Sequence, residues 1–382
     1  MSDWELGPFT RRPGVILGPR DDLSFHCPLS GQPVAWAAKD VFNPGAVVRA
    51  GKVCLLVRAE DRVGRYAGTS RIGLATSSDG ANFTLEPEPV IYPDADDWQA
   101  WEWPGGCEDP RVVETPDGDF VCLYTAFDGS RSSLFSAASS DLRHWEKRGP
   151  AFAGSPLATR WSKSGSIVTE VQAGRLVAAR IQERFWMYWG EGTCFVAASD
   201  DLIRWSPVEY DSDPDRYLIH HPDRDDSPWS VHRVPGPRVA RPVLSPRPGR
   251  FDSLLVEPGP PAVLDQTGIH LIYNGANHPV RGDAQLAPFA YRPGQALLDT
   301  LEPGACIARS TAAFLEVEDE EERRGQVGDV IFAEGLVLFE GRWLLYLGLA
   351  DSRIGWAEAP DRRSIPGRSR RPGDRQSAWP ST

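Results

Sequence analysis

Ala75-Thr76-Ser77-Ser78-Asp79-Gly80-Ala81-Asn82-Phe83 is a nine-residue stretch that returns twice further along the chain. The two copies are Ala137-Ala138-Ser139-Ser140-Asp141-Leu142-Arg143-His144-Trp145 and Ala197-Ala198-Ser199-Asp200-Asp201-Leu202-Ile203-Arg204-Trp205. In each copy an Asp precedes an aromatic residue by four positions, and the three Asp residues are 62 and 60 residues apart. Similarity at such a regular spacing indicates a repeated structural unit.

Two weaker copies extend the pattern toward the C-terminus. Ala296-Leu297-Leu298-Asp299 and Trp356-Ala357-Glu358-Ala359-Pro360-Asp361 place their Asp residues 62 positions apart. The interval from Asp201 to Asp299 is 98 residues, so this unit is expected to carry an insertion. Residues 206–252 are rich in Pro, Arg and Asp and are the predicted inserted loop.

The repeated units predict a β-propeller. Each unit contains short apolar and β-branched runs bounded by Gly, Asp, Asn and Pro, which is typical of strands joined by tight turns. The repeated Asp predicts a turn whose backbone N–H groups are capped by the carboxylate, and its aromatic partner is expected to pack between sheets. We therefore predict an all-β fold, a five-bladed β-propeller with a loop insertion in the fourth blade region. Residues 1–361 form one catalytic domain in this prediction, and the Pro/Arg/Ser-rich tail 362–382 is expected to be disordered.

The composition excludes several classes of function. The chain has 382 residues and a net charge of −12, which argues against nucleic acid as a partner because a phosphate backbone needs a basic face. No apolar stretch is long enough for a membrane helix, and the first residues lack a secretory pattern, so we expect a cytoplasmic protein. The six cysteines and seven histidines show no metal-binding spacing, so no metal or other cofactor is predicted.

The strongest candidate for a site is Trp101-Glu102-Trp103-Pro104-Gly105-Gly106-Cys107-Glu108-Asp109-Pro110-Arg111. This stretch holds three carboxylates, one guanidinium and two adjacent glycines, and it leads directly into a predicted strand. Glycine permits sharp turns and close approach of a ligand, and Pro110 favours an extended conformation at Asp109. From the residues alone, a structural turn stabilised by Asp109 and Arg111 remains an alternative.

The same stretch resembles the signature of glycoside hydrolase family 130, the β-mannoside phosphorylases and β-mannosidases. Similar motifs follow in the same order along about 320 residues, among them Asn43-Pro44-Gly45-Ala46, Trp161-Ser162-Lys163-Ser164-Gly165-Ser166 and Tyr346-Leu347-Gly348-Leu349-Ala350-Asp351. The resemblance implies a five-bladed propeller, in agreement with the repeats, and it implies that Asp109 is the general acid. Because an acid must be protonated to act, we expect burial and the neighbouring Glu108 to raise the pKa of Asp109.

The resemblance also implies binding residues. Phosphate, as a co-substrate, is expected to bind Lys163, Arg131 and Arg111, since phosphorolysis needs cations rather than a base. Sugar hydroxyls are expected to bind the residues that match the family's sugar pocket, together with Glu108: Asn43, Arg58, Glu108 and Asp351. From the residues alone, surface positions, turns and ion pairs between blades remain alternatives for all of these.

Three functions are compatible with this pattern. The first is an inverting phosphorylase that cleaves a β-mannoside oligosaccharide with phosphate and releases α-mannose 1-phosphate. The second is an inverting β-mannosidase, in which Glu183 or Glu191 would be the base. The third is a carbohydrate-binding propeller without catalysis. The resemblance further implies a homo-oligomer.

The sequence departs from the family pattern near its C-terminal end. Asp329 and Ala333 replace the Asn and Pro that are usual there, and Asn274 stands where His is frequent. We expect these changes to affect specificity for the acceptor sugar.

Overall fold

Strands are the main secondary structure in the computed structural model, which describes residues 3–62, 68–155, 157–211 and 238–361. The helical elements of this part are one short α-helix, α1 (Gln99–Glu102), and one 3₁₀ turn, η1 (Glu320–Glu322). No helix in the described ranges is long and apolar enough to cross a membrane. The all-β prediction is confirmed.

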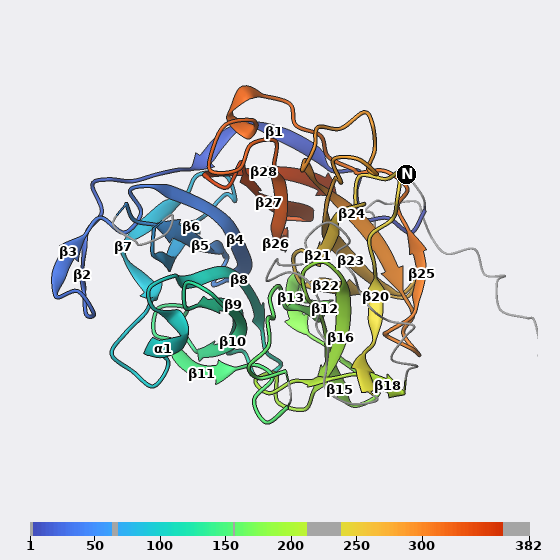
Figure 1. Ribbon diagram of the computed structural model, residues 1–382, viewed down its shortest axis with the longest axis horizontal. Coiled ribbons are helices and arrows are strands. Elements are labelled where there is room, and N and C mark those ends of the chain that lie inside the picture. The colour runs from blue at the N-terminus through green and yellow to red at the C-terminus, as the bar shows by residue number, and fades with distance from the viewer. Residues whose placement is uncertain (1–2, 63–67, 156, 212–237, 362–382) are drawn as a thin grey trace, which may run out of the picture.

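The strands form successive antiparallel groups around a central axis, and we call these groups blades 1 to 5 (Figure 1). Blade 1 consists of β4 (Asp40–Arg49), β5 (Lys52–Glu60), β6 (Ser70–Ser77) and β7 (Thr84–Ile91). Blade 2 consists of β8 (Gly106–Glu114), β9 (Phe120–Phe127), β10 (Ser132–Ser139) and β11 (Glu146–Pro150).

Blades 3 and 4 have interrupted strands. Blade 3 consists of β12 (Ser166–Gln172), β13 (Arg175–Ala178), β14 (Arg180–Ile181), β15 (Arg184–Trp189), β16 (Cys194–Ser199), β17 (Ser206–Pro207) and β20 (Pro242–Leu244). Blade 4 consists of β21 (Leu255–Pro258), β22 (Ala262–Leu264), β23 (Ile269–Ala276), β24 (Tyr291–Leu298) and β25 (Cys306–Arg309).

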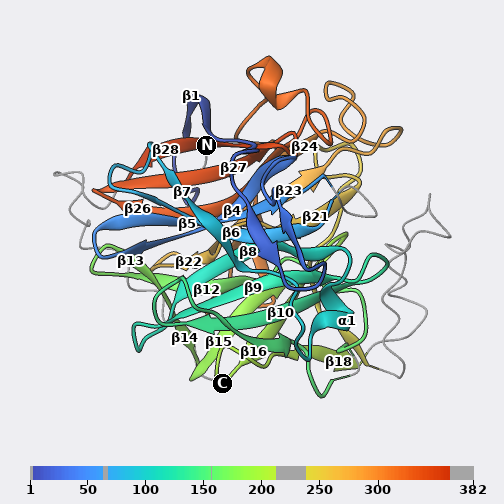
Figure 2. The same ribbon diagram turned by 90° about the vertical axis from the view of Figure 1, so that its left-hand side faces the viewer.

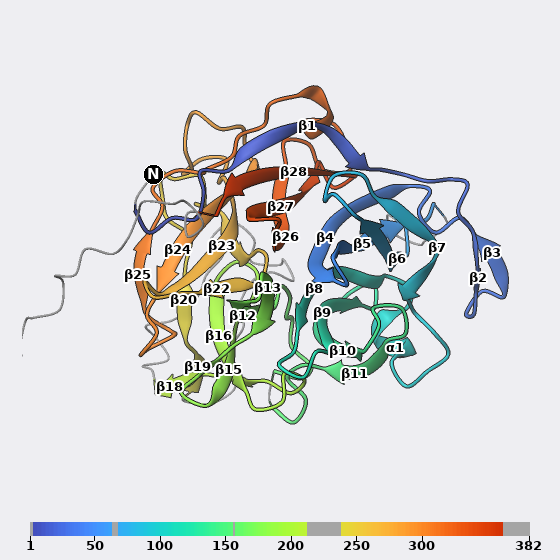
Figure 3. The ribbon, with the colours of Figure 1, turned by 180° about the vertical axis from the view of Figure 1, so that it is seen from behind.

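Blade 5 joins the two ends of the fold. It consists of β26 (Ile331–Phe339), β27 (Arg342–Leu349), β28 (Arg353–Pro360) and the N-terminal strand β1 (Thr10–Leu17). β1 lies along β28, with Thr10 opposite Glu358, as the view from behind shows (Figure 3). The N-terminal strand thus covers an edge of the last blade that would otherwise have unpaired backbone groups.

Two small sheets lie outside the blades. β2 (Phe25–Cys27) pairs with β3 (Gln32–Val34) beside blade 1, and β18 (Glu209–Asp211) pairs with β19 (Arg238–Ala240) beside blade 3. β26, β4 and β8 are neighbouring strands around the central axis (Figure 1), and the side view shows blades 5 and 1 next to each other (Figure 2). These strands approach closely at Gly45, where an added Cβ would lie 2.4 Å from the carbonyl oxygen of Pro110.

The repeated turn has the predicted structure. In the third copy, Asp201 Oδ1 accepts hydrogen bonds from the N–H groups of Ile203 and Arg204 at 2.9 and 2.8 Å. The Asp residues of the first two copies bond in the same way to the backbone two and three positions later. The buried Trp205 packs in the core between blades 2 and 3, so the aromatic residue also has its predicted role.

The insertion differs from the prediction in its position. Both β17 and β20 pair with β16, so residues 206–207 and 242–244 form the outer edge of blade 3 rather than a loop in the fourth blade region. The inserted part of this edge is therefore shorter than 206–252. Residues 212–237 and the predicted disordered tail 362–382 lie outside the described residues.

Candidate active site

Asp109 lies at an irregularity of β8, the inner strand of blade 2. The register with β9 shifts between Glu108 and Arg111, and Asp109 has a φ of 47°. A bulge of this kind turns a side chain away from the regular alternation of the strand. Asn43 in β4 has a similar conformation, with a φ of 43° and a register shift beside it. Two inner strands therefore bend where they carry predicted site residues.

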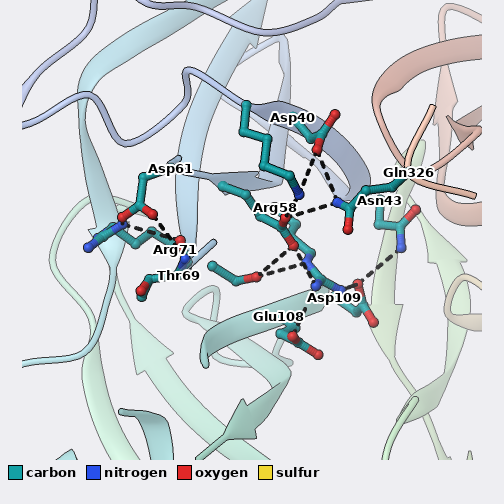
Figure 4. Close-up of polar contacts among 12 residues, drawn as sticks. Asp40, Asn43, Arg58, Asp61, Thr69, Arg71, Glu108, Asp109 and Gln326 are labelled. Atoms are coloured by element: carbon teal, nitrogen blue, oxygen red, sulfur yellow. Dashed lines mark hydrogen bonds and ion pairs between the residues drawn. The ribbon is translucent and has the colours of Figure 1, made fainter. Parts of the chain in front are cut away.

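Blade 1 holds the carboxylate of Asp109 through two side chains (Figure 4). Its Oδ1 accepts hydrogen bonds from Asn43 Nδ2 at 3.0 Å and from Arg58 at 2.9 Å. Arg58 also donates to Glu108 at 2.9 Å and to Glu60 at 2.8 Å. Burial opposes the charge of Arg58, but the carboxylates around it outweigh burial and raise its pKa well above the ordinary value.

A network behind Arg58 connects the site to the loop before blade 5. Glu60 accepts hydrogen bonds from Lys39 at 2.7 Å and from the amide of Gln326 at 2.9 Å. Gln326 also donates to Asp40 at 3.0 Å, as Figure 4 shows. The residue after Gln326, Val327, lines the cavity in front of Asp109, so this network positions one wall of the site.

A cavity of about 190 Å³ opens in front of Asp109 and is lined by residues of all five blades and their loops. The lining residues are Asn43, Arg58, Asp109, Lys163, Glu191, Glu257, Tyr291, Val327, Val330, Phe332 and Asp351. A larger groove, of about 830 Å³, runs along β7 and β11 at the outer edges of blades 1 and 2 and contains none of these residues. We assign the site to the smaller cavity because the predicted acid and its partners converge there.

Lys163 reaches the acid from blade 3. Its Nζ lies 3.9 Å from Asp109 Oδ2 and 4.0 Å from Glu108 Oε2. Burial disfavours its charge, but Glu191, Asp109 and Glu108 outweigh this effect and raise its pKa above the ordinary value. Lys163 is therefore a charged ammonium group that faces the cavity.

The pKa of Asp109 is the reverse of what the sequence led us to expect. Burial favours the protonated form, but Arg58, Lys163 and Arg111 outweigh burial and hold the pKa well below its usual range. Asp109 is thus ionised in the protein without substrate. The expectation of a raised pKa was wrong because it took Glu108 and burial into account and left out the cations.

The other acids of the cavity have raised pKa values. Burial raises the pKa of Glu191 to about 8, although Lys163 acts in the opposite direction. Burial likewise raises the pKa of Asp351 to about 7 and also raises that of Glu257. A buried charged carboxylate is costly, so these groups bind protons that they would release in water.

Arg111 and Arg131, two of the predicted phosphate ligands, do not line the cavity. Arg111 is almost fully buried and donates to backbone carbonyl groups, including that of Asp109 at 3.1 Å. Arg131 lies over the ring of Trp101, at 4.5 Å from its centroid, and 3.6 Å from Asp128. Among the predicted phosphate ligands, only Lys163 is found in the lining of the cavity.

Of the two candidate bases, Glu191 lies at the cavity and Glu183 does not. Glu183 lies in an exposed turn between β14 and β15 and does not line the cavity. Glu191 lines the cavity and accepts a hydrogen bond from Trp161 Nε1 at 3.1 Å.

The sequence prediction missed Glu257 and Tyr291. Glu257 is buried at the inner strand of blade 4, where Ser164 Oγ donates to it at 2.8 Å. Its environment in the sequence, Val256-Glu257-Pro258, contains one acid inside an apolar strand, and this was the available signal. Tyr291 is the first residue of β24 and had no such signal.

The departures at Asn274 and Ala333 are linked in the structure. Asn274 is fully buried and donates to the carbonyl oxygen of Ala333 at 2.9 Å, while its own Oδ1 accepts from the Ala333 N–H at 2.8 Å. The Asn274 side chain and the Ala333 backbone thus join blades 4 and 5. Neither lines the cavity.

A carboxyl group held by an amide and a guanidinium, with further acids across a cavity, is typical of enzymes that cleave glycosidic bonds. Aspartate side chains can accept hydrogen bonds from sugar hydroxyls, and asparagine side chains can both accept and donate them. In the ranges that the structure describes, no three His, Cys, Asp or Glu residues are grouped so that they could hold a metal ion.

Comparison with known proteins identifies the family. The sequence model of glycoside hydrolase family 130, described as β-1,4-mannooligosaccharide phosphorylase, matches residues 8–365. The chain therefore belongs to this family, and it is an enzyme of the class that acts on β-mannosides. The predicted family membership is confirmed.

Individual relatives include both phosphorylases and hydrolases. A 1,2-β-oligomannan phosphorylase of Thermoanaerobacter sp. (strain X514) is 30% identical over 332 residues, which cover 84% of this chain and 90% of the relative. A solved family 130 structure, from work describing hydrolases that target β-1,2 mannosidic linkages in Candida mannan, is 40% identical, with a TM-score of 0.84 over 94% of this chain and 95% of that chain. A glycosyl hydrolase of Bacteroides ovatus is similar to the same degree, with 40% identity, a TM-score of 0.84 and the same coverage.

Proposed function

We propose that this protein cleaves β-mannosides by inverting phosphorolysis. Asp109 supplies the proton that the leaving sugar oxygen needs, by way of a substrate hydroxyl, and a phosphate oxygen attacks the anomeric carbon from the opposite face. The products are α-mannose 1-phosphate and the shortened sugar. The observation that carries this proposal is the position of Lys163, a cation with 13% of its side chain exposed that lies 3.9 Å from Asp109 in the cavity. The 30% identical phosphorylase supports it.

Phosphate binding would also favour the protonated form of Asp109 that an acid catalyst needs. In the protein without substrate, Lys163 is one of the cations that keep Asp109 ionised. A phosphate dianion bound to Lys163 compensates this charge and adds a negative charge close to the acid. Both effects raise the pKa of Asp109, so that the acid takes up a proton when phosphate binds.

Hydrolysis is a second candidate, because the cavity holds carboxyl groups that could act as a base. It is lined by four carboxyl groups, those of Asp109, Glu191, Glu257 and Asp351, and by two cations, Arg58 and Lys163. An ionised carboxylate can orient and deprotonate a water molecule, and Glu191 and Asp351 ionise as the pH rises through their raised pKa values of about 8 and about 7. Glu191 is the candidate base, and the 40% identical relatives described as hydrolases support this alternative.

Product analysis with and without phosphate distinguishes the two reactions. The purified protein is incubated with a panel of β-mannobioses, and sugar products and mannose 1-phosphate are quantified. Phosphorolysis gives α-mannose 1-phosphate that depends on phosphate, and hydrolysis gives free mannose at a rate that phosphate does not increase. No turnover on a panel of all linkages would contradict both candidates and would leave a carbohydrate-binding protein.

Three further features complete the proposal. In the reverse direction a phosphorylase transfers mannose from mannose 1-phosphate to an acceptor sugar, so it is also a glycosyltransferase. We propose a cytoplasmic location, since the six cysteines are free thiols, and a homo-oligomer, on the basis of the family resemblance. Light scattering of the purified protein tests the assembly, and a single-chain mass of about 42.1 kDa would contradict it.

A further inference from the structure

Arg111 connects the backbone of blades 2 and 4 behind the cavity. Its guanidinium donates to the carbonyl oxygen of Asp109 at 3.1 Å, in blade 2. It also donates to the carbonyl oxygens of Pro258 and Gly259 at 3.1 and 3.2 Å, in blade 4. Pro258 directly follows Glu257, so one guanidinium joins the backbone of the proposed acid to the strand that carries a carboxyl group on the other side of the cavity.

Glu334 faces this guanidinium from blade 5. It is fully buried, and its Oε2 lies 3.7 Å from Arg111, which is longer than a hydrogen bond. Neither of its carboxylate oxygens has a hydrogen-bond partner among the described residues. A buried polar group without partners destabilises the folded state, so a fold without another requirement would place an apolar residue here.

The backbone is irregular at both ends of this contact. Asp109 has a positive φ at the register shift of β8, and Glu334 lies at the register shift of β26, between Ala333 and Gly335. The paired hydrogen bonds of Asn274 to Ala333 hold the second irregularity in place. Arg111 therefore bonds to the backbone at the first bend, and Glu334, whose Oε2 lies 3.7 Å from it, stands at the second.

We propose that Arg111 and Glu334 are positioning residues for the acid: Arg111 fixes the Asp109 backbone against blade 4, and Glu334 gives the guanidinium a polar, uncharged neighbour from blade 5. This inference rests on the proposed role of Asp109 but is the same for phosphorolysis and hydrolysis. It assigns Arg111 a role behind the acid instead of a direct contact with phosphate. The ring of Phe332, a wall of the cavity, lies 5.9 Å from the guanidinium carbon, so the same group also supports the cavity wall.

Charge is part of this arrangement. Burial raises the pKa of Glu334 well above its ordinary value, although Arg111 acts in the opposite direction. A neutral Glu334 leaves the positive charge of Arg111 uncompensated, and this charge contributes to the low pKa of Asp109. An ionised Glu334 would instead repel Asp109 from behind.

The first test is Arg111→Lys, which keeps the charge but loses the fork that reaches carbonyl groups in two blades. Kinetics are measured with the β-mannobiose that the wild type cleaves, in whichever reaction it catalyses. We expect kcat to fall by about 10–100-fold while KM for sugar changes less than about threefold, as for a misplaced catalytic group. The matched control is Arg175→Lys, whose half-exposed side chain pairs with Glu114 at the other end of the same strand.

Other outcomes of this test are informative. A lower melting temperature with an unchanged kcat per folded molecule would show a merely structural role and overturn the inference. A KM for phosphate that rises more than about tenfold at constant kcat would make Arg111 a phosphate ligand and overturn it as well. A wild type without any turnover would instead contradict the proposed function.

The second test compares two substitutions of Glu334. Glu334→Gln keeps the shape and a polar group, whereas Glu334→Leu removes the polar group at similar volume. We expect kcat to fall less than about tenfold in the Gln variant and more than tenfold in the Leu variant, with KM for sugar changed little in both. Equal kcat values for wild type and Glu334→Leu would overturn the role of Glu334.

Discussion

Lys163 Nζ and Asp109 Oδ2 lie 3.9 Å apart, so the proposed acid and the proposed phosphate-binding cation contact each other in the protein without substrate. Attraction between them stabilises the ionised form of Asp109. An acid catalyst must however hold a proton when the glycosidic bond breaks. Ligand binding therefore has to change this pair before the reaction, and the pair itself can be tested.

Replacing Lys163 tests whether phosphate binds at this cation. In Lys163→Met, we expect KM for phosphate to rise by at least about tenfold, because a charge-assisted contact is lost. Lys52→Met is the matched control, since Lys52 is exposed at the first position of β5. A KM for phosphate equal to that of the wild type would place the phosphate elsewhere.

Proton uptake can be measured directly for the same pair. Titration calorimetry with phosphate in buffers of different ionisation enthalpy counts the protons taken up on binding. We expect net uptake at pH 7 in the wild type, since the pKa of Asp109 starts well below its usual range and rises when phosphate binds. Binding without proton uptake at Asp109, detected as equal uptake in wild type and Asp109→Asn, would contradict the coupling.

Asp109→Asn tests the acid itself. We expect kcat on a β-mannobiose to fall by about 10²–10⁴-fold, because the amide cannot supply a proton to the leaving oxygen. An aryl mannoside whose leaving group needs no proton should lose much less activity, whereas a merely damaged site would lose both alike. Asp200→Asn, an exposed position, is the control. Retained activity on the disaccharide would remove Asp109 from its role.

The sequence predicted features that depend on neighbouring residues. It was less informative about contacts that form only when distant parts of the chain come together. The repeated turns are made by residues within four positions of one another, so their motif predicts their hydrogen bonds. The contact of Asp109 with Arg58 joins residues 51 positions apart and was accessible through the resemblance to the family.

Arg111 and Glu257 show what could not be predicted. Arg111 is adjacent to the acid in sequence, yet its side chain points to carbonyl groups 147 and 148 positions away, in a blade that the sequence does not place beside it. Glu257 reaches the cavity because blade 4 lies across the central axis from blade 2 (Figure 1). Likewise the pairing of β1 with β28 joins residues from the two ends of the chain, which no local pattern indicates.

The repeated turn is expected to contribute measurably to stability. In Asp201→Ala, two backbone N–H groups lose a charged acceptor, and we expect the free energy of unfolding to fall by about 1–2 kcal/mol. Denaturation in urea gives this value. Asp200→Ala is the control, because the side chain of the neighbouring Asp200 is exposed and forms an ion pair with Arg184 at the surface. Equal losses in the two variants would show that the turn is not held by its carboxylate.

Glu191 predicts opposite effects of pH on stability and on hydrolysis. Its pKa is raised by burial from an ordinary value of 4.5 to about 8, so the folded protein holds a proton that the unfolded chain has released above pH 4.5. Raising the pH from about 4.5 to 8 therefore lowers the free energy of unfolding, and the loss ends above pH 8. The Glu191→Gln variant has no carboxyl group at this position to ionise. Its free energy of unfolding should therefore decline less than that of the wild type over this range. Parallel declines in urea denaturation between pH 5 and 9 would contradict the raised pKa.

The same proton decides whether Glu191 can act as a base. Hydrolysis requires the ionised carboxylate, so its rate should rise with pH up to about 8, and Glu191→Gln should lose at least about 100-fold. Phosphorolysis needs no base, so there the variant should lose far less, and the rise toward pH 8 should be missing. Rates of mannose and mannose 1-phosphate release, measured from pH 5 to 9 for both proteins, give the answer. If mannose is released and Glu191→Gln releases it at the wild-type rate, Glu191 is not the base. Glu257, whose pKa is also raised by burial and which also interacts with Lys163, then becomes the residue to replace.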